Sequence, residues 1–268
     1  LRVGPLGLAG GYGAPSKALL RAFERGANYW YHGSRRPPGM TQAVREILAM
    51  GKREELVLVL QSYARFAWLL ALTFTRGLRA LGLDYADVLL LGWHNRLPGD
   101  AIMERALSLK KRGLCRHIAI SSHHRPAFVG FARDERFDVL HVRYNAAHTG
   151  AEQEVFPHLS KRNVGVTTYT ATRWAALLDP AFTPPGDRTP TAPDCYREGE
   201  APLKARDCYR FVLSQPHFDV CLSGPSTVEH VDEALAALDA GPLGAEEEAR
   251  ARRIGAHVHR HVRSLLAG

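Results

Sequence analysis

Histidine, arginine and aromatic side chains follow many of the short apolar runs of this chain, at the points where strands of a parallel sheet would end. Imidazoles can act as general acids or bases, and guanidinium groups bind carboxylates and phosphates. The sequence therefore predicts acid–base or anion-binding chemistry at one edge of a sheet. The catalytic candidates are Tyr31, His94, His123 and Arg143, and the substrate-binding candidates are His32, Arg36, Gln61, Trp93 and His141.

A metal site is a weaker interpretation of the same residues. Imidazoles from several strand ends could supply three ligands, and histidine is the commonest metal ligand. No H-x-H, H-E-x-x-H or carboxylate-rich signature stands at a strand end. A histidine in such a composition is more often a packed or solvated side chain, and we expect no metal.

Composition narrows the class of protein. The formal charge is +8, but lysine and arginine are scattered, which favours small anions over nucleic acid as partners. The longest apolar run, residues 67–74, is far shorter than the roughly 20 residues of a membrane span. The four cysteines form no C-x-x-C pair. We therefore expect a cytoplasmic protein with reduced thiols and without a signal peptide, and the oligomeric state stays open.

The order of elements predicts an α/β fold with one domain over residues 1–268. Amphipathic segments separate the β-rich runs, for instance residues 15–25 and 101–112, and such alternation is typical of a parallel sheet. Eight repeats favour a closed (β/α)8 TIM barrel over an open sheet. A long loop at residues 177–205 follows strand seven, and residues 246–266 form a C-terminal helix. The eight expected strands are residues 2–8, 27–32, 56–62, 87–93, 117–121, 138–144, 165–170 and 219–223.

Five segments in the same order resemble the aldo-keto reductase superfamily. LGLDYADVLLL at residues 81–91 is similar to its L-G-L-D-Y-x-D-x-x-L-x, and IAISS at residues 118–122 to its I-G-V-S-N. VRYN at residues 142–145 resembles its Q-x-x-Y-N, and VTTYT at residues 166–170 its A-Y-S segment. LSGPSTVEH at residues 222–230 resembles its I-P-G-A-x-S-x-E-Q. The resemblance implies a barrel that uses NADPH to reduce carbonyls without metal.

The same resemblance implies a catalytic tetrad of Asp, Tyr, Lys and His, in which the lysine lowers the pKa of the tyrosine acid. Aligned on the family's F-D-T-A-x-x-Y-G, Tyr31 takes the Asp position and Arg36 is near the Tyr position. Gln61 replaces the Lys, and Gly92 replaces the His. None of the four is kept. His94, two residues beyond Gly92, is then the best single candidate for an acid or base, although a solvated loop histidine is an equal alternative.

Part of the cofactor pattern is retained. The resemblance implies that Ser121, Ser122, Asn145 and Tyr169 hold and stack a nicotinamide, while His141 stands in the family's Gln position. Where the family has an Arg that binds the 2′-phosphate, this chain has Ser226, and where it has an Asn that binds adenine, this chain has Ala234. NADP binding is therefore expected to be weakened or lost. The turn at the start of the next helix could still bind a phosphate through backbone N–H groups. Its residues are Gly224, Ser226 and Thr227.

Arg143 is the most informative charged residue. By alternation it shares one strand face with His141 and Asn145, and the resemblance turns that face inward. A buried arginine needs a counter-ion, which favours a carboxylate or phosphate ligand. An internal ion pair with Asp87 or Asp138 is an equal alternative.

Three hypotheses about function remain open, and whether the chain is an enzyme stays undecided. The first is an aldo-keto reductase-like oxidoreductase with a remodelled site, acting on a small anionic or hydroxylated metabolite. The second is a non-redox hydrolase or lyase using His94, His123 or His141 with Arg143. The third is a catalytically silent ligand-binding barrel. Convergence of Tyr31, Gln61, His94 and Arg143 on one pocket would support the two enzymatic hypotheses.

Overall fold

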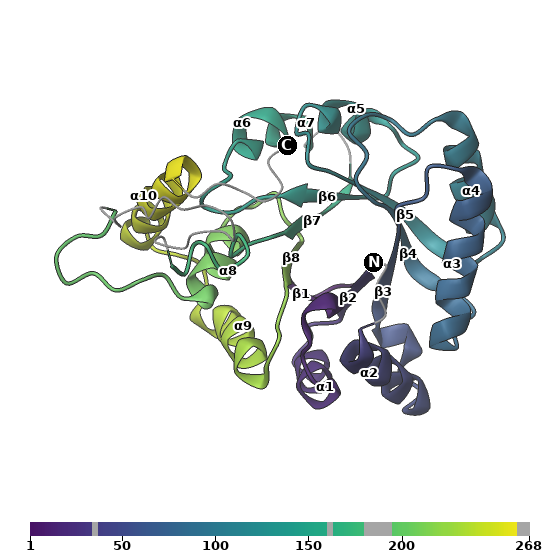
Figure 1. The fold of residues 1–268 in the computed structure, drawn as a ribbon, viewed down its shortest axis with the longest axis horizontal. Helices are drawn as coiled ribbons and strands as arrows, with labels where there is room; N and C mark the ends of the chain where they lie inside the picture. Colours follow the sequence, from purple (N-terminus) through teal and green to yellow (C-terminus); the bar gives the residue numbers. More distant parts are fainter. Residues whose placement is uncertain (34–36, 160–162, 180–194, 262–268) are drawn as a thin grey trace.

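Eight parallel strands close into one barrel in the computed structural model, which describes residues 1–33, 37–159, 163–179 and 195–261 (Figure 1). Each strand pairs with the next, and β8 pairs with β1. The predicted (β/α)8 barrel is thus confirmed. The strands are β1 (Leu6–Ala9), β2 (Tyr29–Gly33), β3 (Val57–Ser62), β4 (Ala86–Leu91), β5 (Cys115–Ser122), β6 (Val139–Arg143), β7 (Gly165–Tyr169) and β8 (Val220–Ser223).

Helices surround the barrel, as Figure 1 shows, and α10 packs beside α8. The predicted C-terminal helix is confirmed as α10, and the connection from β7 runs to Ala205, with residues 180–194 outside the described part. The helices are α1 (Ser16–Glu24), α2 (Pro38–Ala49), α3 (Ala67–Leu81), α4 (Asp100–Lys111), α5 (Ala127–Arg133), α6 (Ala151–Glu154), α7 (Phe156–Leu159), α8 (Ala205–Leu213), α9 (Val228–Ala240) and α10 (Ala245–His261).

The strands are apolar on both faces because both faces are covered. Along β3, Val57 and Val59 belong to a small cluster inside the barrel, while Leu58 and Leu60 belong to the larger core beneath the helices. Val139 of β6 also lies in the inner cluster. Since side chains alternate along a strand, His141 and Arg143 share the face of Val139. None of the described helices is long and apolar enough to cross a membrane.

One hydrogen bond recurs four times at the amino-terminal end of the barrel. An Asx side chain at the start of each even-numbered strand accepts the backbone N–H of a residue in or just before the preceding strand. This hydrogen bond fixes the register between the two neighbouring strands, because it satisfies a backbone N–H that would otherwise lack an acceptor. The pairs are Asn28 with Gly4 (3.0 Å), Asp87 with Leu58 (2.8 Å), Asp138 with Ile118 (2.8 Å) and Asp219 with Val166 (2.7 Å).

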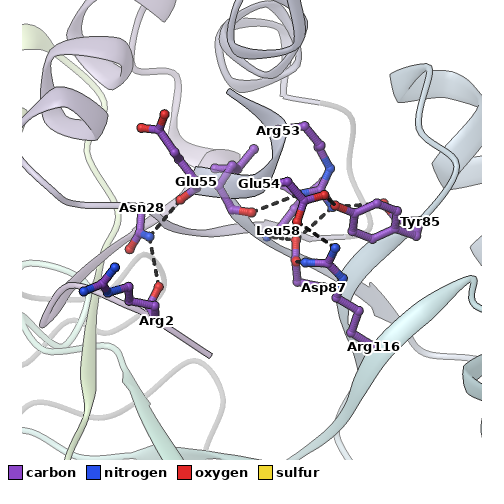
Figure 2. Close-up of polar contacts among 10 residues, drawn as sticks. Arg2, Asn28, Arg53, Glu54, Glu55, Leu58, Tyr85, Asp87 and Arg116 are labelled. Atoms are coloured by element: carbon purple, nitrogen blue, oxygen red, sulfur yellow. Dashed lines mark hydrogen bonds and ion pairs between the residues drawn. The ribbon is translucent and has the colours of Figure 1, made fainter. Parts of the chain in front are cut away.

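The second of these positions carries a denser network, drawn in Figure 2. Arg53 and Arg116 both contact the Asp87 carboxylate, at 2.9 and 3.3 Å. Their guanidinium groups also lie over the Tyr85 ring, 4.1 and 4.2 Å from its centroid. The Tyr85 hydroxyl donates to Glu54 at 2.5 Å. The network therefore links the chain before β3 to β4 and β5.

These contacts exclude the internal partners expected for Arg143. Asp87 pairs with Arg53 and Arg116, and Asp138 pairs with Lys110 at 2.7 Å. Both aspartates lie at the starts of strands, whereas Arg143 lies at the end of β6. Because the strands are parallel, those positions are at opposite ends of the barrel. The expectation of an Arg143 pair with either aspartate was wrong.

Candidate active site

A cavity of about 570 Å³ opens at the carboxyl ends of the strands, where the loops of a barrel converge. Its volume is within the range of small-molecule sites. The lining is rich in aromatic rings from different parts of the chain. They belong to Tyr12, Tyr31, Tyr63, Trp93, Tyr169, Trp174 and Tyr209. We call this cavity the mouth pocket.

Many of the site residues predicted from sequence lie in this pocket. His32 instead lines a neighbouring cavity of about 460 Å³ beside α3, and its Nε2 contacts the Thr41 hydroxyl at 3.1 Å. Arg36 lies outside the described residues. The predicted residues that line the mouth pocket are Tyr31, Gln61, Trp93, Ser121, His123, His141, Tyr169, Gly224 and Ser226, and those that do not are His94, Ser122, Arg143, Asn145 and Thr227.

Three residues outside the pocket wall hold its loops in place. The Ser122 hydroxyl donates to Asn95 Oδ1 at 3.1 Å. Asn145 Nδ2 donates to the Thr170 carbonyl at 2.7 Å, which ties the loop after β6 to that after β7. Thr227 Oγ1 accepts the His230 N–H at 3.2 Å and caps α9. These side chains shape the pocket without lining it.

The positions aligned with the family tetrad form a different cluster. The Tyr31 hydroxyl donates a hydrogen bond to Gln61 Oε1. A Cβ atom on Gly92 would lie 2.1 Å from Gln61 Nε2 and 2.9 Å from the Tyr63 ring, so these two side chains occupy the space beside the glycine. Burial, and then Tyr63, raise the pKa of Tyr31 above its ordinary value. At neutral pH this phenol is a hydrogen-bond donor and a poor proton donor.

Gly92→Ala is expected to lower the free energy of unfolding by roughly 1–3 kcal/mol, because the added methyl group overlaps the Gln61 amide. Urea denaturation measures the change. In a Gln61→Ala background the same substitution should cost much less, since the overlapping amide is gone. Equal costs in both backgrounds would show that Gln61 does not fill the space beside Gly92.

His141 forms part of the pocket floor and is 2% exposed. Its Nε2 lies 2.8 Å from the Tyr29 hydroxyl. Burial lowers the pKa of His141 to about 3, so the imidazole is neutral at neutral pH. It can therefore exchange hydrogen bonds with an uncharged ligand group, and it is a weak base.

An arginine that the sequence interpretation did not single out organises the β4 loop. Arg65 donates to the carbonyls of Gly92 and Trp93 at 3.1 and 2.5 Å, and its Nη1 lies 3.3 Å from His94 Nε2. Because a guanidinium only donates, His94 Nε2 is the acceptor in this contact. Burial, followed by the Arg65 charge, lowers the pKa of His94 to about 4. His94 is thus a partner of Arg65 and has no lone pair directed at the mouth pocket.

The Arg65 contacts support a strained residue at the rim. Trp93 has φ 56°, in the left-handed region that bulky side chains rarely adopt. Ser121 Oγ accepts the Trp93 N–H at 3.0 Å. The indole stays 47% exposed and packs 5.2 Å from the His123 ring, which lies 5.8 Å from Tyr169. Three rings from three strand ends therefore form one continuous wall.

The mouth pocket extends away from the barrel axis towards α9. Its far end is lined by Gly224, Ser226, His230 and Glu233. Ser226 Oγ lies 2.8 Å from His230 Nδ1. A Cβ on Gly224 would lie 2.6 Å from the Tyr12 ring, so this ring packs directly against the glycine. The mouth pocket is therefore a groove whose lining includes strand-end residues and residues at the N-terminal end of α9.

Several lining residues could not be identified from a strand-end pattern. Tyr63 lies two residues after Gln61, so alternation was a usable signal for it. Tyr12 ends a short 3-10 helix (Gly10–Tyr12) and Trp174 lies in a loop, and neither segment has a periodic pattern, while Tyr209 and Glu233 lie on helices. In the described part of the chain, no three His, Cys, Asp or Glu side chains gather closely enough to hold a metal ion.

The fold and this groove define a (β/α)8 barrel with a cavity of small-molecule size at its mouth. The sequence model of the aldo/keto reductase family matches residues 70–256, more than half of the chain, and the chain therefore belongs to this family of oxidoreductases.

Similar folds are found in solved aldo-keto reductases. One from Bacillus halodurans, in its holo form, has a TM-score of 0.75 and 20% identity over 95% of this chain and 93% of that chain. One from Klebsiella pneumoniae, in complex with NADPH, has a TM-score of 0.74 and 22% identity over 95% and 92% of the two chains. At these identities the likeness shows the fold alone. No curated protein sequence matches this chain.

Proposed function

We propose that this chain is an NADP(H)-binding oxidoreductase with a remodelled acid site, acting on a small anionic or hydroxylated metabolite. The observation that carries the proposal is the lining of the mouth pocket, which includes Tyr169 at a strand end and Gly224, Ser226 and His230 around the start of α9. Family membership supports the redox class. The four cysteines, all in the described part of the chain, are buried and form no disulfide, which suits a reducing cytoplasm.

The residues along the groove fit a dinucleotide. Tyr169 presents a ring beside the barrel axis, and its hydroxyl is fixed by a 2.7 Å bond to the Ser122 carbonyl. Gly224 and Ser226 bring backbone and hydroxyl groups to the groove where α9 begins, and a helix N-terminus favours a phosphate. The Glu233 carboxylate, farther along the groove, could accept a hydrogen bond from a base or a ribose hydroxyl. When bound there, NADPH would supply a hydride.

The chain's own residues would position the substrate by hydrogen bonds. The Tyr31 hydroxyl and the Gln61 amide lie together on the wall of the mouth pocket, where they could orient a carbonyl or hydroxyl oxygen. The raised pKa of Tyr31 makes proton transfer from this phenol slow at neutral pH. We therefore propose turnover well below that of an enzyme with an activated tyrosine, and tight dependence on substrate orientation.

Titration with NADPH, followed by fluorescence and thermal shift, tests the proposal. Saturable binding is expected in the micromolar range, with stabilisation of about 2.7 kcal/mol at 100 times Kd. Tyr169→Ala should weaken binding roughly 10- to 100-fold, because the stacking ring is lost. Tyr169→Phe, which keeps the ring, is the matched control. Absence of any response at millimolar NADPH would refute the redox proposal.

The non-redox alternative receives less support from the geometry. His94 is engaged by Arg65, and neither His94 nor Arg143 lines the mouth pocket with Tyr31 and Gln61. The expected convergence of those four residues therefore holds only for Tyr31 and Gln61. A silent ligand-binding barrel would differ from the proposed enzyme by binding NADPH without oxidising it in the presence of carbonyl compounds.

A further inference from the structure

A group of cationic side chains lies at the corner of the barrel mouth formed by β5, β6 and β7. Arg143 ends β6 and is 8% exposed, although arginine is rarely buried without a partner. In the strand register it lies opposite Tyr169. Arg173 Nε lies 3.2 Å from His148 Nε2, and both residues are buried. Burial, and then the positive charge of Arg143, lower the pKa of His123, His148 and Arg173.

The anionic groups near this corner are already paired with other cations. Glu154 forms an ion pair with Arg125 at 2.9 Å, and Glu152 pairs with Arg252 at 2.9 Å. Among the residues that the structure describes, none forms a hydrogen bond or ion pair with the Arg143 guanidinium. Tyr169 is no counter-ion, because burial raises the pKa of its phenol and keeps it neutral.

His148 adds a second unmatched donor. Arginine only donates, so His148 Nε2 accepts from Arg173 and the ring proton is on Nδ1. His148 Nδ1 is buried and has no hydrogen-bond partner. A buried N–H without an acceptor and a buried charge without a counter-ion both destabilise the folded protein. Two such donors at one corner indicate that an acceptor with negative charge belongs there.

We propose that Arg143 and His148 form a subsite for a small oxyanion, a carboxylate or phosphate group, at the β5–β7 corner of the barrel mouth. Tyr169 and His123 line the mouth pocket, and Tyr169 is the register partner of Arg143, so an anion bound to Arg143 lies next to the pocket. A substrate whose reactive carbon reaches Tyr31 could place its anionic end here. That last step rests on the proposed function, whereas oxyanion binding itself does not require NADP.

Titration of the cofactor-free protein tests the subsite. Inorganic phosphate and acetate are added in separate series at constant ionic strength, with chloride as the reference anion, and binding is followed by thermal shift and calorimetry. Saturable binding of at least one oxyanion is expected. Arg143→Met should weaken it at least tenfold, whereas Arg96→Met, which removes an exposed charge of the β4 loop, should change it less than twofold. Preference for phosphate or for acetate tells the two ligand classes apart.

The basal stability of the variants separates ligand binding from a structural role. With no anion, Arg143→Met should be at least as stable as the wild type, because it removes a buried charge without a counter-ion. Arg143→Lys keeps the positive charge but loses the planar guanidinium group, so it should bind the oxyanion several-fold more weakly than the wild type. It also provides a second variant if Arg143→Met fails to fold.

Two results would overturn the subsite. One is the absence of saturable binding of phosphate or acetate by the wild type. The other is unchanged binding by both Arg143 variants, which would place the anion at the turn before α9 instead. Because NADPH is absent throughout, failure here leaves the NADPH titration unaffected, and the two proposals can fail separately.

Discussion

Acidification from pH 7 to pH 5 is expected to lower the free energy of unfolding by several kcal/mol. Three buried histidines, His94, His141 and His148, have pKa values lowered to about 4, about 3 and about 3, chiefly by burial. In the unfolded chain each titrates near 6.5. Below that pH the unfolded state binds protons that the folded state does not, so stability falls as the pH falls.

The size of the effect follows from the number of protons. Below about pH 6.5 each histidine contributes at most about 1.4 kcal/mol per pH unit, so over the roughly 1.5 units down to pH 5 the three together set an upper bound of roughly 6 kcal/mol. We expect about half of this bound. The loss should continue until the pH reaches the folded-state values near 3 to 4. Urea denaturation at pH 7, 6 and 5 measures the slope.

His141→Gln is the variant that assigns the slope. Glutamine can still bond the Tyr29 hydroxyl but binds no proton, so the slope between pH 6.5 and pH 5 should fall by roughly a third. His124→Gln, at an exposed position of the β5 loop, should leave it unchanged. If His141→Gln leaves the slope as in the wild type, His141 does not remain neutral in the folded protein.

The fold was predictable because its signal is repeated along the whole chain. Apolar runs separated by amphipathic segments identified all eight strands, and the run at residues 56–62 matches β3 (Val57–Ser62) to within one residue. The first strand was predicted from residue 2 but begins at Leu6. Pro5 has no N–H, and the Gly4 N–H bonds to the Asn28 side chain, so neither residue donates to the ladder, although the Pro5 carbonyl still accepts the Cys221 N–H at 2.8 Å.

The site was predictable only as far as strand ends define it. Parallel strands place their carboxyl ends together, which brought Tyr31, Gln61, His123 and Tyr169 to one pocket. The same rule could have excluded an ion pair between Arg143 and Asp87, since one ends a strand and the other begins one. The roles of loop residues were not accessible in this way. The contacts of Arg65 depend on the left-handed turn at Trp93, and no periodicity encodes that conformation.

Asp87→Ala is expected to lower the free energy of unfolding by about 3–5 kcal/mol. The carboxylate is 1% exposed, accepts the Leu58 N–H and contacts both Arg53 and Arg116. Its removal leaves a buried N–H without an acceptor and deprives Arg53 of its anion, and breaking a buried pair from one side carries a cost of this size. The Tyr85 ring between the two guanidinium groups cannot replace the lost charge.

Asp219 offers the matched comparison for Asp87. It makes the same hydrogen bond, to the Val166 N–H at 2.7 Å, but lies at an exposed position, and no described cation forms an ion pair with it. Asp219→Ala should therefore cost only about 1 kcal/mol. Asp87→Asn, which keeps an acceptor for Leu58 but loses the charge, should fall between the two alanine variants. Urea denaturation at neutral pH measures all three. Equal losses for Asp87→Ala and Asp219→Ala would mean that the two arginines add nothing to the Asx contact, and that the network of Figure 2 contributes specificity of register and not stability.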